Sequence, residues 1–427
     1  MPLLPLWILQ FSFGVAAAMA VYAYVVYPLL LSGLTRIRSR PIAKGEHTPF
    51  ISLVIPAHDE EAIIRQKLDN SLVLDYPRDR LEILVASDGS KDRTDAMVQE
   101  FANRGLVRFF AFPVRRGKAA ILNEVISDAR GHIVVFSDAN VMYASDAIRK
   151  LVRGFSDPQV GCISGNVILV NDHTGFGDGE TAYYRLERFI QGRESRLGSI
   201  IGADGGMFAL RRELFHPIDP RTVLDDFVIS MNVATRGFRL TYEEEARGYE
   251  LASVTIRDEF RRRKRIAGGI WQALIHGWGL PTWRNGFLFF AFLSHKIARW
   301  IAAFAMGVCL LTSGLLSGAG TWWDVVFGVQ VAAYATVTAG WWAVGHGWKI
   351  PTWLRVALYF VLSNAATVVG ILHAMTREEP VMWPRGARHP GRKGTGLGPA
   401  CAGVSVGASR SLPHLTESRQ ASCRGGR

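Results

Sequence analysis

Carboxylates that directly follow apolar, strand-like runs are the first residues of this sequence with the types and spacing for chemistry. In HIVVFSDANVMY, residues 132–143, Asp138 and Asn140 stand two positions apart after the run IVVF. Asp88 follows a similar run in LEILVASDG, residues 81–89. Hard divalent cations bind oxygen ligands, and Mg²⁺ typically takes one or two carboxylates together with substrate phosphates. The pattern favours a metal site at Asp138 and Asn140 over the alternative, a polar turn that caps a strand.

A Gly-Lys pair in RRGKAAILNE, at Gly117 and Lys118, opens a stretch with helical composition. The N-terminus of a helix offers backbone N–H groups to anionic oxygens, and a lysine ammonium adds a positive charge there. The full spacing of a P-loop is missing, so the pair is not that motif. It indicates a diphosphate contact at Lys118, with a solvated basic turn as the alternative.

Asp225 and Asp226 are adjacent carboxylates in TVLDDFVISMNVATRG, ahead of an amphipathic helical stretch. One could act as a general base while the second orients it or tunes its pKa. The alternative is that both simply favour the N-terminus of a helix. The same choice applies to Glu60 in HDEEA, residues 58–62, which opens the helix after the first strand.

Five consecutive basic residues occupy positions 261–265. Arg262 and Arg265 share a face if this segment is helical. Guanidinium groups suit a departing diphosphate, because their donors match its oxygens. A basic run beside apolar segments can also anchor a protein at a membrane surface.

These residues must be positioned by an α/β domain. Strand-like runs at 51–57, 81–89, 107–112 and 132–140 alternate with helix-like stretches, which predicts βαβ units and a mostly parallel sheet covered by helices. Ligands of open α/β sheets bind beyond the carboxyl ends of the strands. Asp88 and Asp138 are therefore expected to point into a crevice there.

The rest of the sequence is typical of a membrane protein. The whole chain has 427 residues, of which 49% are hydrophobic. Residues 6–34 carry no charge and are long enough to cross a hydrocarbon core of about 30 Å. A cleaved signal peptide is the alternative for this segment. Three further spans are predicted at 297–317, 325–345 and 354–375.

The net charge of +12 is placed beside the predicted spans, mainly at 36–44 and 257–265. The positive-inside rule then puts the soluble domain on the cytoplasmic side of the membrane. The protein is therefore expected to be a multi-pass protein of the inner cell membrane. The soluble part has no basic patch with interleaved aromatic residues, so no nucleic-acid partner is expected. Four scattered cysteines imply neither a zinc site nor a disulfide framework.

The predicted organisation has five parts, and no internal repeat is present. They are an N-terminal transmembrane helix (1–35), a cytoplasmic catalytic domain (48–258), interfacial amphipathic helices (259–296, the second at 283–296), three transmembrane helices (297–376) and a disordered tail (385–427). The side of the membrane on which the tail lies depends on the span count.

In their order, the motifs resemble the family 2 glycosyltransferases of the membrane-bound polysaccharide-synthase type. The likeness covers about residues 48–275 through VIPAHDEEA, ASDGSKDRTD, RRGKAAILNE, VVFSDAN, GADGGMFALRREL, LDDF and RRKRIAGGIWQ. Each motif is weak alone, and the ordered set is specific. The resemblance implies a GT-A-like (Rossmann-type) fold, a nucleotide-sugar donor, with a UDP-sugar expected, and Mg²⁺ or Mn²⁺.

The resemblance also implies roles on the donor side. Asp88 corresponds to the carboxylate that reads the nucleotide base, and Lys118 to a basic group beside the diphosphate. Asp138 corresponds to the first Asp of the DxD motif, which contacts metal and ribose. Asn140 replaces the second Asp, which removes one negative charge from the metal site. Glu60, in VIPAHDEEA, joins them as a candidate nucleotide-sugar contact.

On the acceptor side, Asp226 corresponds to the general base and Asp225 to its acidic neighbour. The QxxRW motif of processive synthases is altered here. Arg262 replaces its Gln, Arg265 keeps the diphosphate-binding arginine, and Ile266 replaces the Trp that lines the acceptor site. Trp271 and Gln272 follow about one turn later and could substitute.

The sequence thus predicts inverting, metal-dependent transfer of a sugar to a growing polysaccharide at the cytoplasmic membrane face. The altered QxxRW motif keeps a second enzyme open, which adds one sugar to a lipid-linked acceptor. A third alternative is an inactive assembly partner of a polysaccharide machine. The presence of Asp88, Asp138 and Asp226 argues against the third.

Overall fold

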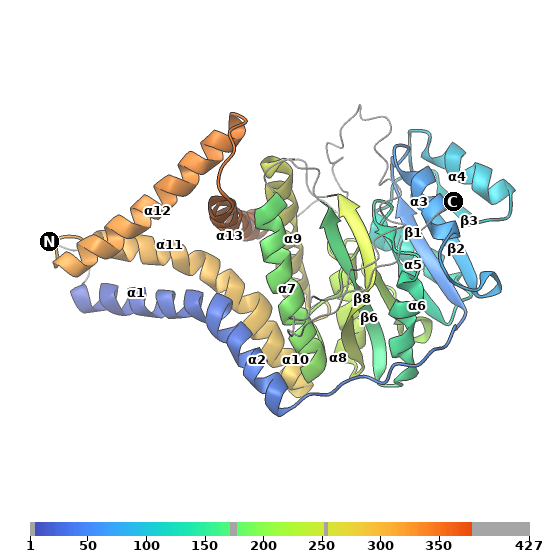
Figure 1. Ribbon diagram of the computed structural model, residues 1–427, viewed down its shortest axis with the longest axis horizontal. Helices are drawn as coiled ribbons and strands as arrows, with labels where there is room; N and C mark the ends of the chain where they lie inside the picture. Colours follow the sequence, from blue (N-terminus) through green and yellow to red (C-terminus); the bar gives the residue numbers. More distant parts are fainter. Residues whose placement is uncertain (1–4, 171–176, 252–254, 378–427) are drawn as a thin grey trace, which may run out of the picture. The chain divides into compact units, whose positions relative to one another are not determined.

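The computed structural model describes residues 5–170, 177–251 and 255–377, with the side chains of residues 177–181 left out of the description. The tail predicted at 385–427 lies outside the described residues. The described part contains an eight-stranded sheet with strand order β3-β2-β1-β4-β7-β6-β8-β5. Figure 1 shows this sheet between covering helices, beside a set of long helices. The predicted α/β class is confirmed.

The first four strands are parallel neighbours, as the strand–helix alternation predicts. They are β1 (Ile51–Ala57), β2 (Leu81–Asp88), β3 (Arg108–Phe112) and β4 (Ile133–Phe136). β1 pairs with β2 on one side and β4 on the other, with Ile51 opposite Leu81 and Ile133. This register brings the ends of β2 and β4, and therefore Asp88 and Asp138, to the same edge of the sheet.

The predicted mostly parallel sheet is observed, because four of the seven strand pairings in the described part are parallel, and the second half of the sheet adds three antiparallel ones. β7 (Phe208–Arg211) runs antiparallel to β4 and to β6 (Val160–Val170). β8 (Arg239–Leu251) runs parallel to β6, and β5 (Met142–Tyr143) runs antiparallel to β8. The sheet is mixed. An apolar run indicates a buried strand but not its direction, so the sequence pattern could not distinguish these pairings.

Two hydrophobic clusters cover the two faces of the sheet. One contains residues of α3 (Ile64–Leu72), α4 (Thr94–Asn103) and α6 (Ala147–Val152). The other contains residues of α5 (Lys118–Ser127) and α8 (Asp225–Thr235). α5 and α8 therefore begin on the same side of the sheet, with Lys118 and Asp225 as their first residues.

Short 3₁₀ turns lie at Arg78–Arg80, Arg153–Ser156, Arg212–Leu214 and Trp283–Asn285.

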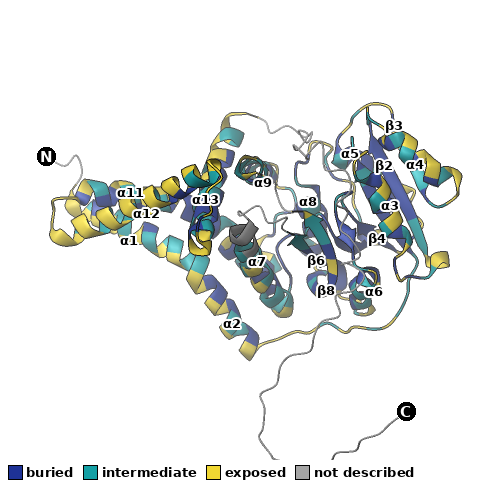
Figure 2. Ribbon diagram, turned by 45° about the horizontal axis from the view of Figure 1, so that its top comes forward, coloured by how far each residue is buried: buried dark blue, intermediate teal, exposed yellow. Residues whose placement is uncertain are grey.

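Four helical stretches in the described part are long and apolar enough to cross a membrane, namely Leu6–Ile37, Phe287–Leu316, Thr321–Gly345 and Thr352–Thr376. The first joins α1 (Leu6–Val21) to α2 (Tyr27–Ile37) through a π-helical turn, and the second joins α10 (Phe287–Ala291) to α11 (Ala298–Leu316) in the same way. α12 (Thr321–Gly345) and α13 (Thr352–Thr376) form the others. Much of α1 and α12 is exposed (Figure 2).

The stretch predicted at 283–296 is not a separate interfacial helix. From Phe287 it continues through the π-helical turn at Phe292–Ile297 into α11. The helix therefore begins ten residues before the span predicted at 297–317. Its first residues pack into the sheet domain, because Leu288, Ala291 and Phe292 belong to the cluster that contains α5 and α8.

Two long helices connect the sheet domain to the apolar helices. α9 (Ile256–His276) packs closely on α13, since a Cβ on Gly370 would lie 2.4 Å from the Lys264 carbonyl oxygen. α7 (Gly177–Leu197) contacts α2, where the Tyr27 hydroxyl donates to Glu194 over 2.6 Å. The basic segment at 261–265 thus lies on a helix held between the sheet domain and α13.

Candidate active site

Asp88 ends β2 and shapes the loop in front of α5. Its side chain is buried, and its two carboxylate oxygens accept hydrogen bonds from the backbone N–H groups of Arg116, over 2.6 Å, and Gly117, over 2.8 Å. Gly117 has a φ of 92°, a conformation that favours glycine. Asp88 therefore fixes the backbone from which Lys118 projects.

The loops after β1 and β2 bind each other. The backbone N–H of Glu60 donates to Thr94 Oγ1 over 2.7 Å, and that of Lys91 donates to Asp59 Oδ1 over 2.7 Å. Asp59 has a φ of 52°, a left-handed conformation that aspartate tolerates better than most residues. This mutual bonding fixes Glu60 next to the loop that carries Asp88.

Lys118 lies between two of the predicted carboxylates. Its ammonium is 2.9 Å from Asp138 Oδ1 and 3.2 Å from Asp225 Oδ2. Burial opposes the charge on this lysine, but the negative charges of Asp138, Asp225 and Asp226 outweigh burial and raise its pKa. The structure thus brings together the predicted diphosphate contact, the predicted metal ligand and the neighbour of the predicted base.

Asp226 stands in the first turn of α8, beside the loop of the GADGG motif. A Cβ on Gly205 would come within 2.7 Å of Asp226 Oδ2, so a larger residue there would displace the Asp226 carboxylate. Burial and the charge of Asp225 raise the pKa of Asp226 to about 7, although Lys118 acts in the opposite direction. A carboxylate whose pKa lies near neutrality is suited to accept a proton.

Asn140 contacts a residue that the sequence analysis did not single out. Its amide nitrogen donates to Glu250 Oε1 over 2.8 Å, across 110 positions of sequence. Burial raises the pKa of Glu250 to about 7; the positive charge of Arg262 acts against this shift, and the negative charges of Asp204 and Asp138 act with it. No local signal marks Glu250, because only the pairing of β8 with its neighbours brings it to this edge.

A divalent cation fits this site only with help from a substrate. The described residues contain no group of three or more His, Cys, Asp or Glu side chains that could hold a metal ion. Asp138 is one-third exposed and the amide oxygen of Asn140 is not used by Glu250. One carboxylate and one amide oxygen match a cation whose remaining ligands are phosphate oxygens and water.

Lys67 holds the loop of Asp138 and Asn140 through hydrogen bonds to residues of that loop. It is fully buried on α3, and its ammonium donates to Ser137 Oγ over 2.6 Å and to the Val141 carbonyl oxygen over 2.5 Å. It also lies 4.3 Å from the centre of the Tyr143 ring. Burial lowers the pKa of Lys67 to about 7. The sequence signal was a lysine on the apolar face of a helix, beside Leu68.

The arginines of α9 reach the site from a different direction. Arg265 donates to the Val223 carbonyl oxygen over 3.1 Å, just before Asp225. Gln272 accepts from the Val223 N–H over 3.1 Å and donates to the Arg221 carbonyl oxygen over 2.9 Å. Arg262 instead donates to the Tyr184 hydroxyl on α7.

The altered positions of the motif lie on the same helix. Ile266 is 37% exposed, and Trp271 is half-buried. Gln272 rather than Trp271 holds the segment in front of Asp225, through its bonds to the Arg221–Val223 backbone. A residue one turn beyond the altered motif therefore helps to position the acidic pair.

Asp204, in the GADGG motif, is a further acidic residue whose role the sequence did not define. Arg188 on α7 donates to Asp204 Oδ2 over 2.5 Å, and the Gly206 N–H donates to Asp204 Oδ1 over 3.1 Å. The Asp204 N–H donates to Ser164 Oγ over 3.0 Å. Asp204 thereby ties α7 to the loop that passes beside Asp226.

Sequence comparisons relate part of this chain to known glycosyltransferases. Residues 52–218 match the family model described as Glycosyl transferase family 2. A probable glycosyltransferase, YdaM of Bacillus subtilis, is 29% identical over 235 residues, which cover 52% of this chain and 55% of that protein. The poly-beta-1,6-N-acetyl-D-glucosamine synthase of Staphylococcus epidermidis is 27% identical over 241 residues, which cover 55% of this chain and 58% of the synthase. The chain thus spans little more than half the length of these relatives.

The solved structure of the mannosyltransferase PcManGT from Pyrobaculum calidifontis, in complex with GDP-Man and Mn²⁺, resembles the fold. It has a TM-score of 0.66 and 22% sequence identity, and the match covers 86% of this chain and 100% of that one. At this identity the likeness concerns the fold alone. The predicted GT-A-like sheet domain flanked by apolar helices is confirmed. Residues 52–218 match the family 2 glycosyltransferases, in agreement with the family that the sequence motifs resemble.

Proposed function

We propose that the protein transfers a sugar, with inversion, from a nucleotide-sugar donor to a growing polysaccharide at the cytoplasmic face of a membrane. The observation that carries the proposal is the convergence of Lys118, Asp138 and Asp225 at one edge of the sheet, next to Asp226. This set provides a positive charge, a metal ligand and a base within one crevice. The family match of residues 52–218 supports the same reaction class.

The donor is assigned to the side of the crevice at β2, β4 and α5. Asp88 and Glu60 would contact the nucleoside, and Lys118 would turn from Asp138 to the diphosphate. Arg262 and Arg265 of α9 would neutralise the departing nucleoside diphosphate, since guanidinium donors match its oxygens. We assign a UDP-sugar as donor. A GDP-sugar is the competing choice, because PcManGT was solved with GDP-Man.

Asp138 and Asn140 would hold Mg²⁺ or Mn²⁺ together with donor phosphate oxygens. When bound, such a cation neutralises charge that develops on the leaving diphosphate. The choice between the two metals rests on measurement, although PcManGT was solved with Mn²⁺. Lys67 and Glu250 position this loop through Ser137, Val141 and Asn140.

Asp226 is assigned as the general base. An acceptor hydroxyl has a high pKa, so its attack on the anomeric carbon is assisted by transfer of its proton to Asp226, an effect of typically ~10²–10⁴-fold. Asp225 keeps the site negative and pairs with Lys118 at 3.2 Å. A single displacement inverts the anomeric centre and needs no second carboxylate as nucleophile.

A second acceptor is supported by one specific feature. Ile266 stands where processive synthases have the Trp that lines the acceptor site, which favours addition of one sugar to a lipid-linked acceptor. The relative from Staphylococcus epidermidis is a polysaccharide synthase, which favours the polymer. Product size separates the two.

The membrane assignment uses the four apolar helices. Their length suits four spans, with the basic segments at 36–44 and 257–265 on the cytoplasmic side together with the catalytic domain. Labelling of cysteines introduced at exposed Lys91 and at exposed Trp322 with a membrane-impermeant reagent tests this. On intact cells, we expect labelling at position 322 and none at position 91, because the proposal places Lys91 inside. Labelling at position 91 would contradict the proposal.

The test of activity uses the full chain in nanodiscs with Mg²⁺ or Mn²⁺, a panel of UDP-, GDP- and dTDP-sugars, and lipid extract as acceptor. We expect metal-dependent release of one nucleoside diphosphate and loss of release in Asp226→Asn. Absence of release from every donor by folded protein would instead support an inactive assembly partner. The size of the product then distinguishes a polymer from a single addition.

A further inference from the structure

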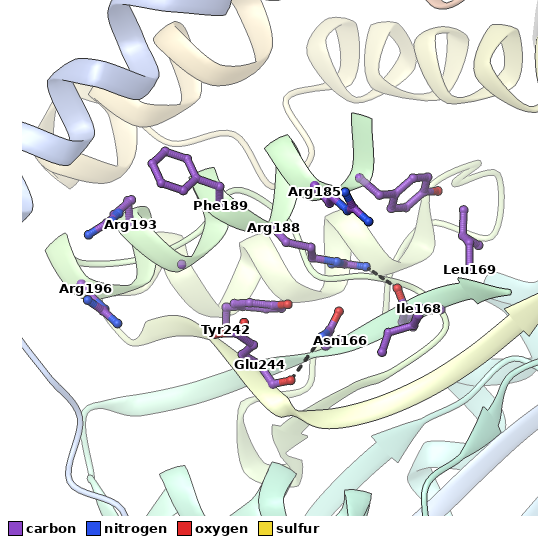
Figure 3. Close-up of a pocket in the computed structure, with 13 residues that line it drawn as sticks. Asn166, Ile168, Leu169, Arg185, Arg188, Phe189, Arg193, Arg196, Tyr242 and Glu244 are labelled. Atoms are coloured by element: carbon purple, nitrogen blue, oxygen red, sulfur yellow. Dashed lines mark hydrogen bonds between the residues drawn. The ribbon is translucent and has the colours of Figure 1, made fainter. Parts of the chain in front are cut away.

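A cavity separate from the candidate active site lies between α7 and the strands β6 and β8 (Figure 3). Its volume is about 550 Å³. One wall is the outer part of β6 from Asn166 to Leu169, with Tyr242 and Glu244 of β8, and the opposite wall is α7. Gly192 on α7 leaves room in that wall, because a Cβ there would meet no atom within 4 Å.

The wall formed by α7 is strongly basic. Arg185, Arg188, Arg193 and Arg196 all line the cavity, and their spacing of three, eight and eleven positions from the first puts them on one face of the helix. Glu244 is the one acidic residue among the residues that line it. Among the described residues, no carboxylate pairs with Arg185, Arg193 or Arg196. The cavity therefore holds an excess of positive charge.

Two buried polar atoms of the cavity's lining residues have no hydrogen-bond partner within the described part of the chain. They are Nε of Arg188 and the hydroxyl of Tyr242. Both atoms have almost no accessible surface, so a ligand in the cavity does not reach them directly. The four arginines that line the cavity are the groups that would bind an oxygen-rich anion.

The basic end of the cavity adjoins the end of the first apolar helix. The Arg40 N–H donates to the Arg196 carbonyl oxygen over 2.7 Å, and Arg193 lies 3.5 Å from the hydroxyl of Thr35 in the last turn of α2. Phe189, over whose ring Arg193 lies at 5.0 Å, is 41% exposed. Basic and aromatic groups at the end of a membrane span are placed to meet lipid headgroups.

We propose that this cavity binds the phosphate headgroup of an anionic membrane phospholipid, held by Arg193 and Arg196 beside the end of α2. The proposal rests on the membrane placement given under the proposed function, and it does not depend on the transferase activity. Arg188 extends from the same cavity to Asp204, which ties α7 to the loop beside Asp226. A lipid bound there would contact the helix that supports the catalytic loop.

The test is a calorimetric titration of the full chain in uncharged detergent with short-chain phosphatidylglycerol, and with phosphatidylcholine of the same acyl chains. We expect phosphatidylglycerol to bind at least tenfold more tightly, and the difference to shrink as salt is added. The double variant Arg193→Gln/Arg196→Gln should lose at least fivefold in affinity for phosphatidylglycerol. Glu244→Gln, which removes the one acid of the lining, should bind it more tightly.

The matched control is Arg104→Gln/Arg130→Gln, which removes two exposed arginines outside the cavity lining. It should bind phosphatidylglycerol as the unaltered protein does. Equal affinities for the two lipids, or equal losses in the two double variants, would overturn the proposal. Glycerol phosphate binding as tightly as phosphatidylglycerol would also overturn it, because the ligand would then be a soluble phosphate. The titration contains no sugar donor, so its failure is distinct from a failure of the proposed enzyme activity.

Discussion

The ammonium nitrogen of Lys118 lies 2.9 Å from Oδ1 of Asp138. The residue assigned to the donor diphosphate therefore neutralises the residue assigned to the metal. A cation and a nucleotide sugar that arrive together can exchange these partners, since the cation takes Asp138 and the diphosphate takes Lys118. Metal alone must compete with the lysine. This arrangement favours binding of the metal and the donor together over binding of the metal alone.

Replacement of Lys118 by Met should separate metal binding from transfer. Without the ammonium, Asp138 is released, so Mn²⁺ alone should bind at least as tightly as in the unaltered protein. Sugar transfer should fall about 10²-fold or more, as expected when a group that stabilises transition-state charge is removed. Electron paramagnetic resonance of free Mn²⁺ and release of nucleoside diphosphate measure the two effects. Lys91→Met, at an exposed position, is the control, and loss of Mn²⁺ binding in Lys118→Met would contradict the assignment.

Asp226→Asn should remove transfer and stabilise the fold at alkaline pH. The pKa of Asp226 is raised to about 7 from an ordinary value of 3.8, so the folded state keeps a proton that the unfolded state releases between these values. The contribution of this group to the unfolding free energy therefore falls as pH rises through this window. The variant lacks that penalty and should have a higher Tm than the unaltered protein at pH 8, with little difference at pH 4.

The same ionisation should govern the rate. A base must be deprotonated, so transfer should increase as pH rises through about 7, and the variant should show no such rise above its residual rate. Asp69→Asn, at an exposed position on α3, should change neither the pH profile nor the Tm difference. Equal Tm gains for the two variants at pH 8 would show that the effect does not come from the site.

Lys67→Met should weaken the metal site at a modest cost to the fold. The buried Val141 carbonyl oxygen loses its donor, which costs about 1–3 kcal/mol, and removal of a buried charge offsets part of this cost. The bonds to Ser137 and Val141 that hold the loop of Asp138 are lost, and Mn²⁺ affinity in the presence of nucleoside diphosphate should drop about tenfold or more. Calorimetry measures this affinity. An unchanged affinity with an unchanged Tm would rule out a positioning role.

Glu194→Ala should loosen α7 from the apolar helices. The fully buried carboxylate accepts from the Tyr27 hydroxyl over 2.6 Å and lies 2.8 Å from Nδ1 of buried His295. Its removal leaves the Tyr27 hydroxyl and Nδ1 of His295 without this acceptor and should cost about 2–5 kcal/mol of the unfolding free energy. Tyr27→Phe removes one hydrogen bond and should cost about 1 kcal/mol. Unfolding of the full chain in detergent gives both values, with exposed Glu124→Ala as the control. A cost below 1 kcal/mol for Glu194→Ala would contradict this view.

The sequence by itself determined the strands β1 to β4 and the polar residues that follow them. Apolar runs that end in carboxylates must be buried strands with polar ends, and the carboxyl ends of parallel strands share one edge. That reasoning was sufficient to bring Asp88 and Asp138 to one crevice. It also located four apolar helices, because length and the absence of charge decide whether a helix can cross a membrane.

Only the tertiary structure decided which distant residues complete the site. Glu250 reaches Asn140 because β8 joins the sheet beside β6 and β5, and an apolar run carries no information about strand direction or neighbour. Lys67 on α3 and Gln272 on α9 bind backbone groups of distant segments, and the sequence does not indicate which groups these are. The basic cavity of α7 likewise depends on how that helix packs against β6 and β8. Contacts over such separations follow from global packing, whereas the patterns along the chain report only local periodicity and burial.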